Sequence, residues 1–247
     1  MTPTDAPSPA PAGLLTIDKP VGPTSMAVCR LVRARLVRGG APKRIKVGHG
    51  GTLDPLATGV LVVLVGKATR LCDTVMAADK TYLADIDLHR TSPTDDLEAP
   101  PRPAPLPPGT SPPDAQTVER VIAGFTGRVM QAPPAHSAMK IEGKRAYELA
   151  RRGDIDQLEK RPVQIHAIDV LLYRWPRLVL RVRCGKGVYI RSLARDIGAE
   201  LGGGGLLAGL RRTAIGGFTE NTAALLRALP AVLTQGNLAE PPRAPSR

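Results

Sequence analysis

The chain has 247 residues, of which 43% are apolar, and it carries 34 Lys and Arg residues against 22 Asp and Glu residues. A chain of this length can bury one substantial core, so we expect one main domain rather than two of full size. The net charge of +12 favours a polyanionic partner over an acidic small molecule, although an ordinary basic protein would also carry such a charge.

The sequence argues against a disulfide-rich protein, a metal-binding protein and a membrane or secreted protein. Cys29, Cys72 and Cys184 are far apart and form no C-x-x-C pair, which argues against a disulfide framework and against a zinc site. The four histidines show no H-x-x-x-H spacing, so we expect no metal. The sequence has neither a run of 18 apolar residues nor a secretory signal. We therefore expect a cytoplasmic protein that does not associate with a membrane.

Proline-rich segments mark the ends of the chain and one internal loop. Residues 1–12 and 236–247 are rich in proline and small residues, and we expect both to be disordered around a single domain at 13–235. Eight of the fourteen positions from Pro100 to Pro113 are proline, which excludes a helix or a central strand. Residues 99–114 are therefore expected to form an extended loop that acts as a spacer.

Between these segments, hydrophobic periodicity predicts strands and helices in mixed order. Strands are predicted over residues 14–17, 60–65, 80–89 and 178–184. Ser25 is expected to cap a helix that buries Val28, Leu31 and Val32. A second helix follows the turn at residues 185–187, with Ile190, Leu193, Ile197 and Leu201 on its buried stripe and Arg191 and Arg195 off that stripe. The mixture indicates an α+β domain rather than a regular doubly wound sheet.

The segment GHGGTLDPLATG at residues 48–59 is the most informative in the chain. Gly50 and Gly51 permit backbone conformations that other residues resist, and Pro55 pushes Asp54 away from helical geometry. We therefore expect the Asp54 carboxylate to sit on a stiff loop. An Asp-Pro pair alone usually marks only a turn. However, Asp54 is the first acidic residue after Asp18, at the end of a stretch rich in Lys and Arg.

Two segments of one charge sign point to nucleic acid. Residues 19–46 and 174–195 carry repeated Lys and Arg and no acidic residue. If they contact phosphates, binding should weaken steeply with salt, because each neutralised phosphate releases counterions. The alternative is two solvated helix faces.

The segment around Asp54 resembles the catalytic loop of the tRNA pseudouridine-55 synthase family, typified by bacterial TruB. Six other strings resemble family segments in family order, namely LLTIDKPVGPTS, VGKATR, KTYLADIDL, PPAHSAMKIEGKRAYELARRG, GKGVYIRSLARDIG and LRRTAIGGF. Together they cover most of residues 14–218. The resemblance implies the pseudouridine synthase catalytic fold, a mixed α+β domain with a largely antiparallel sheet flanked by helices.

The resemblance also implies a catalytic role for particular residues. Asp54 would be the nucleophile, and Arg191 would pair with its carboxylate. Tyr82 and Tyr189 would contact the target uracil, and Leu210 would line the base pocket. Taken without the family, Tyr82 and Leu210 would be interpreted as core residues and Arg191 as a solvated helix residue.

The resemblance implies roles for two further residues near Asp54 in the sequence or in the opening motif. His49 is similar to a family histidine that helps to extrude the base, and Lys19 would support the site from the opening motif. Without the family, His49 would be interpreted as an ordinary loop histidine.

The reaction implied by the family breaks an N-glycosidic bond, rotates the uracil and rejoins it through carbon. It is redox-neutral, so we expect no cofactor, and the sequence contains no phosphate-binding loop, since Gly66-Lys67 is followed by Ala68. A carboxylate at the anomeric carbon suits an oxocarbenium-like transition state, as in retaining glycosidases. An arginine nearby would keep Asp54 ionised. Whether the carboxylate attacks the sugar or the base, or a glycal forms, stays open.

The expected partner is the T-stem-loop of tRNA, bound by a monomer. The target base must leave its stack, and Tyr82 suits the stacking role that would offset that cost. Aromatic residues make up only 3% of the chain, so recognition should depend on RNA shape and phosphates. Residues 124–152 resemble the family insertion that clamps the RNA, with Arg145, Arg151 and Arg152 available for phosphates; an ordinary basic helix is the alternative.

The sequence departs from the family pattern at three points. His136 stands where tyrosine is usual, and His89 stands where glycine is common. We also expect no C-terminal RNA-binding domain. Two rival functions stay open: a non-catalytic RNA chaperone, and a synthase that acts on uridines of other RNAs.

Overall fold

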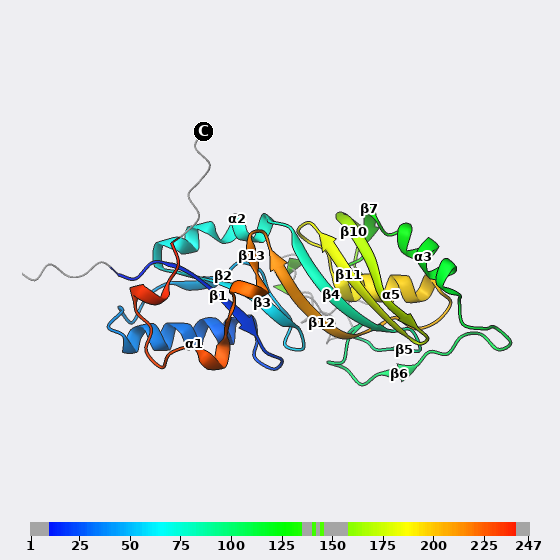
Figure 1. Cartoon of the computed structure of the whole chain (residues 1–247), viewed down its shortest axis with the longest axis horizontal. Coiled ribbons are helices and arrows are strands. Elements are labelled where there is room, and N and C mark those ends of the chain that lie inside the picture. The colour runs from blue at the N-terminus through cyan, green and yellow to red at the C-terminus, as the bar shows by residue number, and fades with distance from the viewer. Residues whose placement is uncertain (1–9, 135–139, 142–143, 146–157, 241–247) are drawn as a thin grey trace, which may run out of the picture. The chain divides into compact units, whose positions relative to one another are not determined.

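The computed structural model (Figure 1) describes four stretches of the chain. They are residues 10–134, 140–141, 144–145 and 158–240. The chain divides into two compact units, the first made of Met1–Ala77 with Ala214–Arg247 and the second of Ala78–Thr213.

The first unit is built around a fully buried strand. β3 (Thr58–Val65) buries every residue from Gly59 to Val65, which confirms the buried strand predicted from its unbroken apolar run. It pairs antiparallel with β1 (Gly13–Lys19) on one side and with β2 (Val47–His49) on the other. β1 pairs in parallel with β14 (Ala224–Leu225). β2 and β3 therefore hold both ends of the segment that contains Asp54.

Helices and short turns complete this unit. α1 (Ser25–Arg38) packs against β2, and α2 (Cys72–Ala77) follows a 3-10 turn at Gly66–Leu71. Further 3-10 turns lie at Glu220–Thr222, Leu226–Ala228 and Gln235–Asn237. β13 (Phe218–Thr219) pairs with the end of β12 (Leu206–Ile215). The two described chain ends meet here, because Ala12 N–H donates to the side chain of Gln235 and Leu14 pairs with Ala239.

The start of α1 differs from the prediction. Thr24, not Ser25, is the N-cap, and its hydroxyl accepts a hydrogen bond from Ala27 N at 3.1 Å. Val28 and Val32 are buried as predicted, whereas Leu31 is only half-buried. The hydroxyl of Ser25 is buried and turned toward another segment, because a second partner competes for it.

The second unit is an antiparallel sheet in the order β12-β4-β11-β10-β7. Its strands are β4 (Lys80–Asp87), β7 (Gly127–Gln131), β10 (Arg161–Arg174), β11 (Arg177–Cys184) and β12 (Leu206–Ile215), whose last two residues belong to the first unit. Short ladders join β5 (Arg90–Thr91) to β6 (Arg102–Pro103) and β8 (Lys140–Ile141) to β9 (Lys144–Arg145).

One face of this sheet is buried, as the alternating burial of its strands shows. β4 buries alternate residues, as predicted, and places Tyr82 opposite Val182 of β11. α3 (Ala115–Ala123) and α5 (Ile190–Glu200) contact each other, and α5 buries the predicted apolar stripe. Arg191 lies off that stripe, as predicted, but only 5% of its surface is exposed, so the interpretation of it as a solvated helix residue is wrong. The predicted α+β class with a largely antiparallel sheet flanked by helices is confirmed.

The proline-rich segment, residues 99–114, forms an extended loop in which β6 is the single short strand. Figure 1 shows this loop at the edge of the second unit. Among the described residues, no helix has the length and apolar character needed to cross a membrane.

Candidate active site

Asp54 lies on the short segment between β2 and β3, and backbone hydrogen bonds hold this segment from both sides. Gly22 N–H donates to Pro55 O at 2.9 Å, and Ala57 N–H donates to Asp54 O at 3.1 Å. The residue Asp54 itself is half-exposed. The carboxylate therefore sits on a tethered turn and can be reached from outside.

Ser25 holds the residue that precedes Asp54. Its hydroxyl donates to Leu53 O at 3.0 Å and accepts from Leu53 N–H at 2.8 Å. A hydroxyl has one donor and two acceptor lone pairs, so a single side chain can satisfy both backbone groups. Ser25 is 2% exposed and Leu53 3%, so water does not compete for these bonds. This role of Ser25 was not predicted from the sequence, where its hydroxyl was expected to cap the helix.

Lys19 holds the residue that follows Asp54. The residue is fully buried, and its ammonium group donates to Pro55 O at 3.3 Å, Pro20 O at 2.9 Å and Pro23 O at 3.0 Å. Burying a charged group is costly unless it is hydrogen-bonded, and three carbonyls match the three donors of an ammonium. Lys19 therefore lies beside the Asp54 turn, at the end of β1.

His49 and two glycines precede Asp54 on the same segment. His49 ends β2, opposite Val63 of β3, and its carbonyl lies 3.7 Å from Cys72 Sγ. A Cβ atom on Gly50 would lie 2.2 Å from a methyl of Val75 in α2, and Gly51 has a φ of +120°. Glycine is therefore required at position 50 by close packing and at position 51 by conformation.

In the second unit, Arg191 is fixed against a turn that the sequence analysis did not connect with it. Its Nη1 donates to Thr94 O at 3.2 Å, and its Nε lies 3.7 Å from Asp96 Oδ2. Asp96 is 4% exposed, and its other oxygen accepts from Thr94 Oγ1 at 2.6 Å and from Glu98 N–H at 2.9 Å. The guanidinium is therefore oriented by a buried carboxylate that is itself held in place.

Arg195, four residues further along α5, forms an ion pair with the same loop turn, at Asp95. Its Nη1 lies 2.9 Å from Asp95 Oδ2, and its Nε donates to Asp196 at 2.9 Å. Burial raises the pKa of the Asp95 carboxyl, and the charges of Arg195 and Arg191 oppose that rise. Asp95 has a φ of +60°, a conformation that few residues other than glycine adopt, although aspartate tolerates it better than most. Two arginines thus attach this turn to the first turns of α5.

The start of α5 is fixed by a glutamine that the sequence analysis also missed. Gln131, at the end of β7, accepts from Tyr189 N–H at 2.8 Å and donates to Tyr189 O at 3.1 Å. It is 3% exposed. Tyr82 is 8% exposed in β4, and Leu210 is half-buried in the neighbouring strand β12. The second unit thus carries Tyr189 at the start of α5 and Tyr82 and Leu210 on adjacent strands.

A family model described as "TruB family pseudouridylate synthase (N terminal domain)" matches residues 40–190, more than half of the chain. The chain belongs to the TruB family of pseudouridylate synthases. It is therefore an isomerase. The family resemblance seen in the sequence and the α+β fold agree with this membership.

Curated relatives in this family match nearly the whole chain. A tRNA pseudouridine synthase B from Phocaeicola vulgatus is 41% identical over 227 residues, which cover 92% of this chain and 95% of that protein. The protein of the same name from Parabacteroides distasonis is 45% identical over 206 residues, covering 83% and 86% of the two chains.

Solved structures support the TruB fold. A chain in the crystal structure of a Cbf5-Nop10-Gar1 complex is similar with a TM-score of 0.65 and 32% identity, over 87% of this chain and 52% of that chain. A chain in the structure of an H/ACA RNP bound to a substrate RNA containing 2'-deoxyuridine gives a TM-score of 0.62 at 29% identity, over 87% and 51%. This chain thus spans about half the length of those chains.

The predicted TruB site residues fall into two groups. Lys19, His49 and Asp54 belong to the first unit, where Lys19 contacts the turn of Asp54. Tyr82, Tyr189, Arg191 and Leu210 belong to the second unit. The pairing of Arg191 with Asp54 stays a prediction from the family resemblance.

Part of the RNA-clamping segment predicted from the TruB resemblance, and with it His136, Arg151 and Arg152, lies outside the described residues. Arg145 lies in β9. His89, the other departure from the family pattern, meets the edge of the Trp175 ring at a centroid distance of 6.5 Å.

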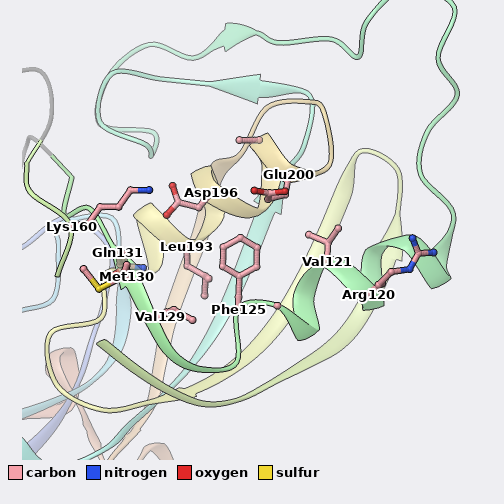
Figure 2. A pocket seen from close by; sticks show the side chains of 12 residues that line it. Arg120, Val121, Phe125, Val129, Met130, Gln131, Lys160, Leu193, Asp196 and Glu200 are labelled. Atoms are coloured by element: carbon pink, nitrogen blue, oxygen red, sulfur yellow. The ribbon is translucent and has the colours of Figure 1, made fainter. Parts of the chain in front are cut away.

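A pocket of about 650 Å³ opens in the second unit beside α5 (Figure 2). Phe125, Leu193 and Val129 line its apolar part, and Asp196 and Glu200 of α5 contribute carboxylates. Gln131, which fixes Tyr189, also lines it. No predicted TruB site residue lies among its lining residues.

Metal ligands do not gather in the part of the chain that the structure describes. There, no three His, Cys, Asp or Glu side chains lie close enough together to hold an ion.

Proposed function

We propose that this TruB family member converts uridine 55 in the T-loop of tRNA to pseudouridine, with the Asp54 carboxylate as nucleophile. The name tRNA pseudouridine synthase B, carried by relatives 41% and 45% identical to this chain, supports the substrate. The observation that carries the role of Asp54 is its tethered turn, which Ser25 and Lys19 hold on either side through buried hydrogen bonds. Such a turn suits a group that must be presented at one fixed position.

The isomerisation exchanges a carbon–nitrogen bond for a carbon–carbon bond and moves one proton, and any bond that the Asp54 carboxylate forms with the sugar or the base breaks again before the product leaves. The bond from N1 of uracil to the sugar carbon breaks, C5 bonds to that carbon, C5 loses its proton and N1 gains one. A nucleophilic carboxylate must be ionised, and a guanidinium within reach favours the ionised form. Arg191 takes this role in the proposal. The buried Asp96 and the Thr94 carbonyl support it, because they restrict the orientations that the Arg191 guanidinium can adopt.

In this proposal a monomer binds the RNA, and exposed Lys and Arg side chains contact its phosphates. A related chain was solved in an H/ACA RNP bound to a substrate RNA. In the first basic segment, Arg30, Arg38, Lys43, Arg44 and Lys46 are exposed.

The second basic segment is partly neutralised. Arg177 and Arg181 lie within ion-pair distance of Asp85 and Asp169, at 2.7 and 3.7 Å. The proposed phosphate contacts therefore come mainly from the first segment, and a loss of about 0.9 in the salt slope is expected for each duplex phosphate contact removed.

The catalytic part is tested by Asp54→Asn, which removes the charge with little change in shape. With tRNA carrying tritium at C5 of uridine, the variant should release no tritium, while its tRNA affinity stays within about twofold, well under 1 kcal/mol. Asp73→Asn, an exposed aspartate in α2, is the matched control and should keep full activity. Unchanged product yield in Asp54→Asn would refute the catalytic role and leave RNA chaperoning as the better explanation.

The substrate position is tested separately. A tRNA transcript with cytidine at position 55 should release no tritium from the wild-type enzyme. Modification mapping in cells that lack the protein should show loss of pseudouridine at tRNA position 55. Loss confined to other RNAs would instead identify a synthase for those uridines.

A further inference from the structure

The proline-rich loop has features that isomerisation does not use. From residue 99 to 113 it contains one positive residue, Arg102, and no acidic residue. Its only regular structure is the two-residue strand β6. The sequence analysis treated it as a spacer, and the structure shows a more specific arrangement.

The backbone of residues 100–108 has little freedom. Every residue in this range is either a proline or directly precedes one. Proline fixes its own φ near −65°, and a residue before proline is pushed to extended geometry. The chain is therefore restricted to polyproline II and related extended shapes before any partner binds.

Contacts within the second unit hold this loop in place. Ala104 N–H donates to His89 O at 2.8 Å, and β6 pairs with β5. The side chain of Leu106 lies beside Gly203, and the hydroxyl of Tyr173 donates to Pro113 O. Ala104 and Leu106 are accordingly half-buried, whereas their proline neighbours are exposed.

Three residues spaced by three are exposed along the loop. Arg102 lies in β6, Pro105 follows in the extended chain, and Pro108 begins a turn, and all three are exposed. Only Ala104 and Leu106 between them are half-buried. The exposed positions thus include the pattern R-x-x-P-x-x-P, which polyproline II geometry, with three residues per turn, would place on one face.

We propose that residues 102–108 form a docking segment for a protein domain that recognises polyproline II. Such domains receive proline rings in grooves lined by aromatic side chains, and a carboxylate beside the groove would pair with the Arg102 guanidinium. The restricted and anchored backbone lowers the ordering cost of binding. The docking segment is independent of the proposed catalytic function.

A protein partner fits this face better than RNA. Proline rings offer neither hydrogen-bond donors nor a planar π surface for a base, and the segment carries a single positive charge in seven residues. Exposed positive charges are far denser in the first unit, between Arg38 and Lys46.

The test is a titration of the full chain with a purified SH3 domain that prefers R-x-x-P-x-x-P ligands, followed by calorimetry. We expect binding in the micromolar range. Arg102→Glu and Pro105→Ala should each weaken it about tenfold or more, which corresponds to about 1.4 kcal/mol. Pro112→Ala, an exposed proline outside the docking segment, is the matched control and should bind as the wild type. Pseudouridine formation should be the same in all variants.

Several outcomes would overturn the docking segment. One is that the wild-type chain does not bind the SH3 domain, and another is that Arg102→Glu, which changes only an exposed side chain, binds the SH3 domain as well as the wild type. A last outcome is that Arg102→Glu weakens tRNA binding while neither wild type nor variant binds the SH3 domain, which would identify Arg102 as an RNA contact. Urea unfolding of each variant excludes a loss of fold as the cause.

Discussion

Replacing Ser25 by alanine should release the Asp54 turn without touching Asp54. The change removes two buried hydrogen bonds to Leu53, of 3.0 and 2.8 Å. A typical bond contributes about 1 kcal/mol net, and a buried group left without its partner costs about 1–3 kcal/mol. Two such groups in a closely packed site give a loss of about 2–4 kcal/mol in the free energy of unfolding.

The rate of pseudouridine formation should also fall, because the released turn no longer holds Asp54 in one position. If only about 2 kcal/mol of the lost free energy falls on the turn geometry that catalysis needs, the rate drops about 30-fold, since 1.36 kcal/mol is tenfold. Single-turnover tritium release at saturating tRNA measures this rate, and tRNA affinity should be unchanged. Ser192→Ala is the matched control. Ser192 is fully buried, but its hydroxyl has no hydrogen-bond partner among the described residues, so its removal should cost little.

The two serine variants together test whether the Ser25 hydroxyl holds the Asp54 turn. Wild-type stability and rate in Ser25→Ala would mean that the hydroxyl does not hold the turn. Equal losses in both variants would mean that any buried serine matters, whatever its hydrogen bonds.

Lys19→Met should lower the free energy of unfolding in urea by roughly 3 kcal/mol, because three carbonyls lose their donor; a stable Lys19→Met would contradict this. Gly50→Ala should destabilise by about 1–3 kcal/mol through contact with Val75, and adding Val75→Ala should restore stability. No recovery in the double variant would place the strain elsewhere. Asp96→Asn should slow single-turnover tritium release without weakening tRNA binding, because the Arg191 guanidinium loses a charged partner; weaker binding at an unchanged rate would contradict that role.

Elements governed by local pattern could be predicted from the sequence. The unbroken apolar run of β3 and the alternation in β4 both matched the burial found. In each case the strand places its side chains by its own period of two, and the sequence shows which of them prefer to be buried. The α+β class follows from the same patterns.

The supports of the site depend on partners distant in sequence, and the sequence could not show them. Thr24 and Ser25 are adjacent hydroxyl residues with similar capping preference, and the choice between them is decided by Leu53, 28 residues away. Arg191 is polar, so periodicity assigns it to solvent. It is buried because the turn at Thr94 and Asp96, 97 and 95 residues earlier in the chain, supplies a carbonyl and a carboxylate.

These contacts explain why the Asp54 turn is fixed through its backbone. In the proposed reaction the Asp54 carboxylate must form a bond with the substrate, and strong bonds to its own oxygen atoms would compete with that step. Ser25 and Lys19 avoid that conflict by binding the carbonyl and amide groups of Leu53 and Pro55. The rigid backbone on either side of Asp54 then limits the positions that its carboxylate can take. A substitution of Ser25 should therefore act on the rate through the geometry of the turn, without changing the Asp54 side chain itself.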